Sequence, residues 1–171
     1  SVFYGIGDRA APGTLEAAGV SIVFVGGKTS IPLAHSILTS IGVPVYALFD
    51  GDAGCEVRAK ANGKPQNKID EERNKNAAEN RKLLGYFGLP QEDFPSAAVL
   101  DNVAIFEDHL ETQLSALWPE WLSACDSVEA AAGINLSKNQ LAYRTATLQA
   151  EGRVPEMLTK ILKMAMGADH A

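Results

Sequence analysis

Residues 43–52 read VPVYALFDGD, and this stretch decides the fold class. Its apolar run is rich in β-branched and aromatic residues and stops at two carboxylates, Asp50 and Asp52, on either side of Gly51. Continuous apolar runs of this length are typical of strands that are buried on both faces of a parallel sheet. Pro44 is tolerable only near the start of such a strand. The pattern therefore predicts a buried strand over residues 43–49 with acidic groups at its carboxyl end.

A second apolar run precedes the first along the chain. Residues 20–25 read VSIVFV, and a glycine-rich turn and a predicted helix over residues 32–41 separate the two runs. A strand, a helix and a strand in this order are typical of neighbouring parallel strands joined by a crossover helix. We therefore expect residues 20–25 and 43–49 to be adjacent central strands.

The rest of the chain is mostly helical in pattern. A polar loop is expected at residues 55–66, a long charged helix at 67–87, and short strands at 97–100 and 103–106. From residue 108 onward the apolar spacing is helical, with a kink or a split at Pro119. Further helices are expected at residues 127–132, 137–149 and 155–166. The prediction is an α/β fold, with a parallel sheet flanked by helices over residues 1–125 and a helical segment over residues 126–171.

Composition excludes several classes of protein. The chain has 171 residues, a hydrophobic fraction of 46% and a net charge of −6, which argue against wholesale disorder and against a non-specific nucleic-acid coat. Its 2 cysteines are too few for a disulfide framework and fit reduced thiols in a cytoplasmic protein. No apolar run is long enough to span a membrane, and the N-terminus has no signal-peptide pattern.

Charge is distributed unevenly along the chain. Between Glu56 and Lys82, 8 basic residues accompany 5 acidic ones, although the whole chain is acidic. One interpretation is a solvated helix with ion pairs between neighbouring turns. The other is a phosphate-facing edge beside an acidic metal site.

The Asp50-Gly51-Asp52 motif is the strongest candidate for chemistry. A buried strand that ends in two carboxylates places two hard oxygen ligands at a sheet edge, and the glycine allows a tight turn between them. Two close carboxylates repel each other unless a cation neutralises them. The competing interpretation is a common Asp-Gly turn with solvated acids.

A second acidic stretch follows the predicted strand at residues 103–106. Glu107, Asp108 and Glu111 have spacings that allow them to share one face of a helix. They could simply complement the helix dipole, but together with Asp50 and Asp52 they would form a carboxylate cluster suited to Mg²⁺ or Mn²⁺. His35 and His109 are isolated in sequence, and a structural or exposed position is expected for both.

The Gly26-Gly27-Lys28-Thr29 stretch is not a phosphate-binding P-loop. That motif requires a glycine at position 22, which is Ile22 here. The glycines instead predict a strand-to-helix turn that places Lys28 near the same sheet edge, where it could contact an anion.

Taken together, these stretches resemble a known family. Residues 19–28, the helix that follows them, and residues 42–53 are similar to the Toprim domain of overcoming-lysogenization-defect (OLD) family nucleases. Residues 106–111, the Ser137-Lys138-Asn139 stretch and Tyr143-Arg144 resemble later elements of that domain, so the similarity spans roughly residues 19–144.

The resemblance implies a metal-dependent DNA endonuclease domain, attached in the full protein to an N-terminal ABC-type ATPase through which it could form a homodimer. Asp50 and Asp52 would be catalytic metal ligands for Mg²⁺ or Mn²⁺, with Ca²⁺ as a possible substitute. Glu107, Asp108 or Glu111 would supply the downstream acid. Lys138 would stabilise charge on the phosphate in the transition state.

One element of the resemblance is missing. Toprim domains open with a strand and a Glu-Gly motif whose glutamate binds metal or acts as a base, and nothing before Gly19 matches it. The chain also lacks an ATPase motif and begins at Ser1, so we expect a piece of a longer protein or a degenerate copy. The alternative function is a catalytically silent Toprim-like module that binds nucleic acid or a partner. A third is a different Mg²⁺-dependent phosphotransfer or phosphatase domain that uses Asp50 and Asp52.

Overall fold

A computed structural model describes residues 1–133 and 139–167 of the chain. The described residues form two compact units, one of residues 23–113 and the other of residues 1–22 together with 114–133 and 139–167. The expected boundary at residue 125 lies inside helix α7 (Pro119–Ala132). Among the described residues, no helix is both long and apolar enough to cross a membrane.

The unit of residues 23–113 is built on a small mixed sheet. Its strands are β1 (Ala47–Asp50), β2 (Ala98–Val99) and β3 (Val103–Phe106), in the order β1-β3-β2. Strand β1 pairs in parallel with β3, with Ala47 opposite Val103 and Asp50 opposite Phe106, whereas β2 pairs with β3 antiparallel. The expected α/β class, a small sheet with parallel pairing flanked by helices, is confirmed.

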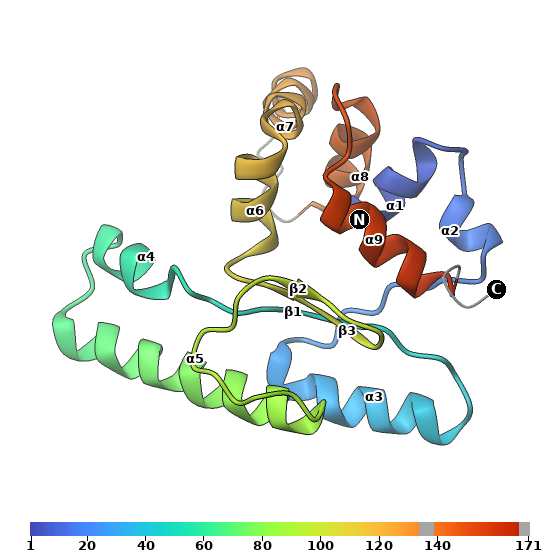
Figure 1. The fold of residues 1–171 in the computed structure, drawn as a ribbon. Coiled ribbons are helices and arrows are strands. Elements are labelled where there is room, and N and C mark those ends of the chain that lie inside the picture. Colours follow the sequence, from blue (N-terminus) through green and yellow to red (C-terminus); the bar gives the residue numbers. More distant parts are fainter. Residues whose placement is uncertain (134–138, 168–171) are drawn as a thin grey trace. The chain divides into compact units, whose positions relative to one another are not determined.

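Helices α3 (Ile31–Ser40) and α5 (Gln66–Tyr86) lie along one face of this sheet (Figure 1). The alternation of strand side chains explains the packing, because every second residue of a strand faces the same side. Ala47 and Phe49 of β1 and Val103 and Ile105 of β3 meet Leu83 and Leu84 of α5 in one buried cluster. The 3-10 turn η1 (Lys28–Ser30) leads into α3, where Pro32 occupies the first turn.

The structure corrects the prediction for residues 20–25, which do not form a strand. The amide of Val20 donates to the carbonyl of Leu15, and the amide of Ile22 donates to the Tyr4 hydroxyl. Val23 and Phe24 are 66% and 84% exposed. A β-branched run becomes a strand only where a neighbouring edge offers hydrogen-bond partners, and among the described strands β1 pairs only with β3. The expected adjacency of residues 20–25 and 43–49 is therefore wrong.

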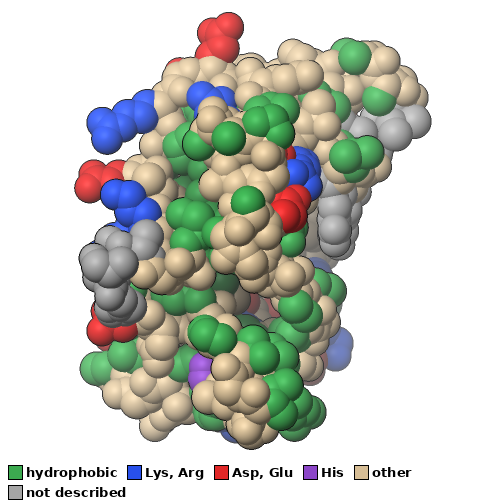
Figure 2. Space-filling view, turned by 90° about the vertical axis from the view of Figure 1, so that its right-hand side faces the viewer, with side chains coloured by type: hydrophobic (Ala, Val, Ile, Leu, Met, Phe, Trp, Pro, Cys, Tyr) green, Lys and Arg blue, Asp and Glu red, His purple; other side chains and the backbone are tan. Residues whose placement is uncertain are grey.

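Several apolar side chains of helix α3 are exposed. Leu33, Ile37 and Ile41 are all exposed, as is the nearby Val43. In the lower part of Figure 2, at the height of α3 in Figure 1, hydrophobic side chains reach the surface with few charged ones among them. The predicted polar loop after residue 55 is also wrong at its start, because residues Cys55–Ala61 form helix α4. Helix α4 buries Cys55 and Ala59, which are four residues apart on one face.

The other unit is helical. It contains α1 (Val2–Asp8), α2 (Thr14–Ala17), α8 (Gln140–Gln149) and α9 (Glu156–Ala165), together with α7 and part of α6 (Leu110–Leu117). The expected split at Pro119 is confirmed, because α6 ends before this residue and α7 begins at it. Helix α1 packs closely on α8: a Cβ on Gly5 would lie 2.6 Å from the Arg144 carbonyl oxygen. The Arg144 guanidinium donates to the Asp8 carboxylate at 2.6 Å.

Candidate metal centre

The carboxyl ends of β1 and β3 bring the two acidic stretches of the sequence together. These strands are parallel and in register at Asp50 and Phe106, so the residues that follow them emerge at the same sheet edge. The amide of Gly51 donates to the Phe106 carbonyl at 2.7 Å, and the amide of Ala53 donates to the Glu107 carbonyl at 3.0 Å. The backbone pairing therefore continues past both strands and fixes the two acidic loops against each other.

The backbone conformation at residues 51 and 52 restricts which residues can occupy these positions. A Cβ on Gly51 would lie 2.8 Å from the carbonyl oxygen of Glu107 and 3.0 Å from that of Phe106, so only glycine fits without a backbone shift. Asp52 has φ of 59°, in the left-handed region that aspartate and asparagine tolerate better than most residues. This conformation turns the Asp52 side chain toward the loop after β3.

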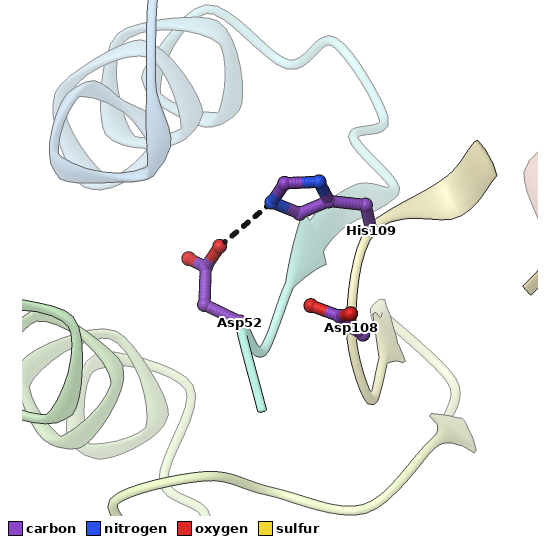
Figure 3. Close-up of side chains that lie close together, drawn as sticks. All are labelled: Asp52, Asp108 and His109. Atoms are coloured by element: carbon purple, nitrogen blue, oxygen red, sulfur yellow. Dashed lines mark hydrogen bonds and ion pairs between the residues drawn. The ribbon is translucent and has the colours of Figure 1, made fainter. Parts of the chain in front are cut away.

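Three metal-ligating side chains converge at this edge. Asp52, Asp108 and His109 each offer one ligand atom, and these atoms lie within 4.8 Å of one another. Figure 3 shows the two carboxylates and the imidazole directed toward a common space. His109 Nε2 lies 3.0 Å from Asp52 Oδ1. An ionised carboxylate can only accept, so Nε2 carries the hydrogen in this contact.

Arg58 joins the two carboxylates. Its Nη1 donates to both oxygens of Asp108, and its Nη2 donates to Asp52 Oδ1 at 3.3 Å. Burial by itself raises the pKa of Asp108, but the hydrogen bonds and charge of Arg58 outweigh it, so the pKa is lowered. A Cβ on Gly54 would overlap with Asp108 Oδ2, so only glycine at this position leaves room for the pair of Arg58 and Asp108.

Lys28 contacts the other oxygen of Asp52. Its ammonium donates to Asp52 Oδ2 at 2.6 Å, to Asn80 Oδ1 at 2.8 Å and to the Asp50 carbonyl at 3.3 Å. Asn80 of α5 is fully buried, and its amide group donates to the carbonyls of Gly51 and Asp93 at 2.7 Å each. The expected position of Lys28 near the sheet edge is confirmed, and its contacts there are oxygen atoms of the protein.

Asp50 has a different environment from Asp52. Burial raises the pKa of Asp50 to about 6, and the negative charges of Asp52 and Glu111 act in the same direction. His109 and a hydrogen bond from the Leu110 amide oppose this rise in pKa. Asp50 is therefore close to the loop after β3, although it is not among the three converging side chains.

The predicted site residues fall into three groups. Asp52 and Asp108 are brought together, and Asp50 and Glu111 are close enough for Glu111 to affect the Asp50 pKa. Glu107 is exposed, and it contributes its carbonyl to the backbone pairing. Lys138 lies outside the described residues. The assignment of each residue as a metal ligand or catalytic group stays a prediction.

Sequence reasoning missed three residues at this edge. His109 was expected to be structural or exposed, yet its position beside Asp108, directly after a strand, was an available signal. Arg58 belongs to the basic stretch, and only the fold distinguishes it from its neighbours. Asn80 is hidden within a polar helical pattern, and its burial follows from the packing of α5 rather than from local sequence.

Other basic residues of residues 56–82 form ion pairs partly within one helix, as the ion-pair interpretation expects, and partly between α4, α5 and the loop that joins them. Lys64 pairs with Glu72 at 2.6 Å, and Lys68 with Glu71 at 2.7 Å. Arg73 pairs with Glu56 at 2.6 Å. Exposed pairs of this kind contribute little to stability, but they give these cations partners within the protein.

The donor set at the candidate centre fits a divalent ion. Carboxylate oxygens suit Mg²⁺, Ca²⁺ and Mn²⁺, whereas an imidazole nitrogen is a common ligand of transition metals. Two carboxylates and one imidazole therefore fit Mn²⁺ better than Ca²⁺. The cationic groups of Arg58 and Lys28 at the same carboxylates indicate a place where positive charge is stabilised.

A family model matches part of the chain. Residues 1–52 match the family model described as the TOPRIM domain of overcoming lysogenization defect protein-like proteins. The match includes Lys28, Asp50 and Asp52, and it begins at residue 1, before the expected start of the resemblance at residue 19. It does not extend to Arg58, Asp108 or His109. No curated protein and no solved structure matches the chain.

Proposed function

We propose that this chain, whose residues 1–52 confirm the resemblance to the Toprim domain of OLD-family proteins, is the metal-dependent nuclease module of such a protein. The observation that carries the proposal is the convergence of Asp52, Asp108 and His109 at the carboxyl ends of two parallel strands. Ligand and catalytic sites of α/β folds gather at such strand ends. The substrate class is DNA, and the reaction is hydrolysis of a phosphodiester.

In this proposal, residues at the acidic edge have roles in metal binding or catalysis. Asp52 and Asp108 would hold a divalent ion, with Asp50 or Glu111 beside them. His109 would be a third ligand once its Nε2 no longer carries the hydrogen that it donates to Asp52. Bound divalent ions supply Lewis acidity and an activated water for in-line attack on phosphorus. Lys28, which contacts Asp52 Oδ2, would fix the orientation of that carboxylate. From the resemblance alone, Lys138 would stabilise negative charge on the phosphate oxygens.

The test is DNA cleavage by the full-length protein in the presence of Mn²⁺. We expect Asp52→Asn to lower the rate of plasmid cleavage by on the order of 100-fold or more, because it removes a charged ligand of the ion. Asp70→Asn is the matched control: Asp70 lies on the exposed surface of α5, and its carboxylate accepts from Gln66. Cleavage that persists in Asp52→Asn, or that needs no divalent ion, would contradict the proposal.

A second candidate function is a module that binds nucleic acid or a partner without cleaving it. The observation that favours it is the neutralisation of Asp52 by two cations of the protein, Lys28 and Arg58, which makes the acidic edge stable without metal. The same assay separates the two candidates. A silent module would retain DNA in a gel-shift experiment with Mn²⁺ and release no cut product.

The proposed partners follow from the family. We propose that the module acts beside an ABC-type ATPase domain in the same full-length protein and that this domain mediates any homodimer. Expression of this chain with and without the upstream part of its open reading frame tests the proposal. ATP-dependent cleavage that appears only in the longer protein is the expected result.

A further inference from the structure

Arg58 contacts the carboxylate oxygens that a divalent ion between Asp52 and Asp108 would need. Its guanidinium contacts both oxygens of Asp108 and Oδ1 of Asp52. These are the carboxylates that, with His109, bring their ligand atoms within 4.8 Å of one another. The Arg58 guanidinium bridges the two aspartates. A metal ion ligated by both aspartates would need the same oxygen atoms.

The two kinds of cation exclude each other at these oxygens. Mg²⁺ and Mn²⁺ need oxygen ligands at about 2.1 Å, so an ion between the carboxylates would stand within a few ångströms of the guanidinium. Two positive groups at such a separation repel strongly at a partly buried site. Arg58 has to leave at least one carboxylate before both can ligate an ion.

Lys28 is not the group that would be exchanged. Its ammonium occupies the opposite oxygen of Asp52, Oδ2, and is held there by Asn80 and the Asp50 carbonyl. The Lys28 side chain is only 11% exposed, whereas that of Arg58 is 32% exposed. The deeper cation can therefore remain on Oδ2 while the shallower one leaves Oδ1.

Helix α4 gives Arg58 a route away from the carboxylates. The helix has seven residues and begins directly after Gly54, and the partly exposed guanidinium can rotate toward solvent without any movement of β1 or β3. Arginine in such a position exchanges one set of oxygen acceptors for water or for phosphate oxygens at modest cost, because its side chain keeps its charge throughout.

We infer that Arg58 is an internal competitor of the divalent ion, which closes the acidic edge in the metal-free protein and leaves it when the ion binds. The inference rests on the proposed function, because the ion is the one proposed there. It goes beyond that proposal by assigning a role to a residue outside the family match and outside the predicted acidic set.

Mn²⁺ affinity is the direct measurement. Free Mn²⁺ is followed by electron paramagnetic resonance during titration of the wild-type chain, Arg58→Gln, Arg58→Lys and the control Lys60→Gln. Lys60 lies on the same helix but pairs with Glu56. Loss of the competing charge-assisted hydrogen bonds should tighten the dissociation constant of Arg58→Gln by roughly 10- to 100-fold. The dissociation constant of Arg58→Lys should lie between those of the wild type and Arg58→Gln, and that of Lys60→Gln should match the wild type.

The outcomes separate the two proposals. If the wild type binds Mn²⁺ and Arg58→Gln binds it equally or more weakly, the competitor role is wrong and the metal site stands. If neither protein binds Mn²⁺ at millimolar concentration, the proposed metal function itself is wrong. Asp52→Asn in the Arg58→Gln background should lose the added affinity.

A second measurement covers the case in which Arg58→Gln fails to fold. In the ¹⁵N-labelled wild type, the Arg58 Nε resonance, assigned with Arg58→Lys, should shift as diamagnetic Mg²⁺ is added. The Arg144 resonance should stay in place, because its guanidinium pairs with Asp8 and Glu16 in the other unit. An Arg58 signal that does not change while Mg²⁺ binds would overturn the inference.

Discussion

At the scale of single residues, Gly51 shows how one missing side chain sets the position of the acidic groups. Three backbone oxygens, of Glu107, Phe106 and Pro95, lie within 3.2 Å of the place where a Cβ would stand. Backbone atoms cannot move aside as the end of a flexible side chain can. The approach of the two loops, and hence of Asp52 to Asp108, depends on this glycine.

We therefore predict that Gly51→Ala lowers the free energy of unfolding by about 2–4 kcal/mol, since the new methyl group separates the loops after β1 and β3. Urea denaturation followed by circular dichroism measures the loss. Gly63→Ala is the control: Gly63 has φ of 68° but no atom within 4 Å of its Cβ position, so only the backbone strain of about 1 kcal/mol is expected. Equal losses in the two variants would contradict the prediction.

The raised pKa of Asp50 predicts a pH dependence. In the metal-free protein the folded state keeps its proton up to a pKa of about 6, above the ordinary value of 3.8. Between these values the folded state binds more protons than the unfolded state, so stability falls as pH rises. With EDTA present, the wild type should lose stability from pH 4 to pH 8 and Asp50→Asn should not. The free energy of unfolding of Asp50→Asn, relative to that of the wild type, should therefore rise by about 2 kcal/mol over this range. A difference that stays constant over this range would show that Asp50 is not buried as described.

The sequence predicted part of the site at this scale, for a physical reason. Carboxylates at the end of an apolar run are visible as residue types, and Asp50, Asp52 and Asp108 all lie at the expected edge. Whether a given oxygen meets a metal, a guanidinium or an ammonium depends on how η1, α4 and α5 pack against the strand ends, which local sequence patterns do not determine. Arg58 and Asn80 could therefore not be singled out.

At the scale of elements, the long helix α5 contributes more than a cover for the sheet. Its apolar residues Leu83 and Leu84 pack on the strands, and one turn earlier Asn80 reaches the loop after β1. Asn80 connects Lys28, Gly51 and Asp93 through three hydrogen bonds. The helix thus supports the acidic edge through one buried amide.

Asn80→Ala is expected to destabilise the protein by about 2–4 kcal/mol, because it leaves a cavity and removes partners from two carbonyls and one ammonium. Asn74→Ala on the exposed side of the same helix should change stability by less than about 0.5 kcal/mol. Thermal unfolding of the two variants in parallel measures the difference. A similar unfolding temperature for both variants would mean that water replaces the Asn80 amide without loss of stability.

Elements with a distinctive local sequence pattern were mostly predicted well. Helix α5, strand β3 and the break at Pro119 all follow from patterns within a few residues. Residues 20–25 were wrong because strand formation needs a hydrogen-bonding edge that the pattern cannot supply. Helix α1 has no clear amphipathic period, so the sequence did not predict it. The burial of Val2, Phe3 and Ile6 follows from the packing of α1 on α8.

At the scale of the whole molecule, the apolar segment at residues 20–25 has exposed side chains and lies outside helices and strands. Phe24 is 84% exposed and lies outside helices and strands, whereas Phe49 and Phe106 are buried in β1 and β3. We predict that limited chymotrypsin digestion cuts first after Phe24, because proteases need exposed and extendable backbone. Mass spectrometry of the first fragments identifies the cut.

Phe24→Ser is the control for this digestion and should remove the early fragments. Buried phenylalanines should be cut only after unfolding. Resistance of the wild type at Phe24 would contradict the free exposure of this segment and would indicate that another chain covers it in solution.

The parallel pairing of β1 with β3 also has a consequence for the order in which the protein is made. All of α4 and α5 lies between the two strands in the chain, so Asp52 leaves the ribosome long before Asp108 and His109 do. Closing so long a loop is entropically costly, and it can occur only after β3 has emerged. Until then the nascent chain carries isolated carboxylates without the geometry to hold an ion. The acidic edge can therefore assemble only after synthesis has passed His109 and these residues have left the ribosome.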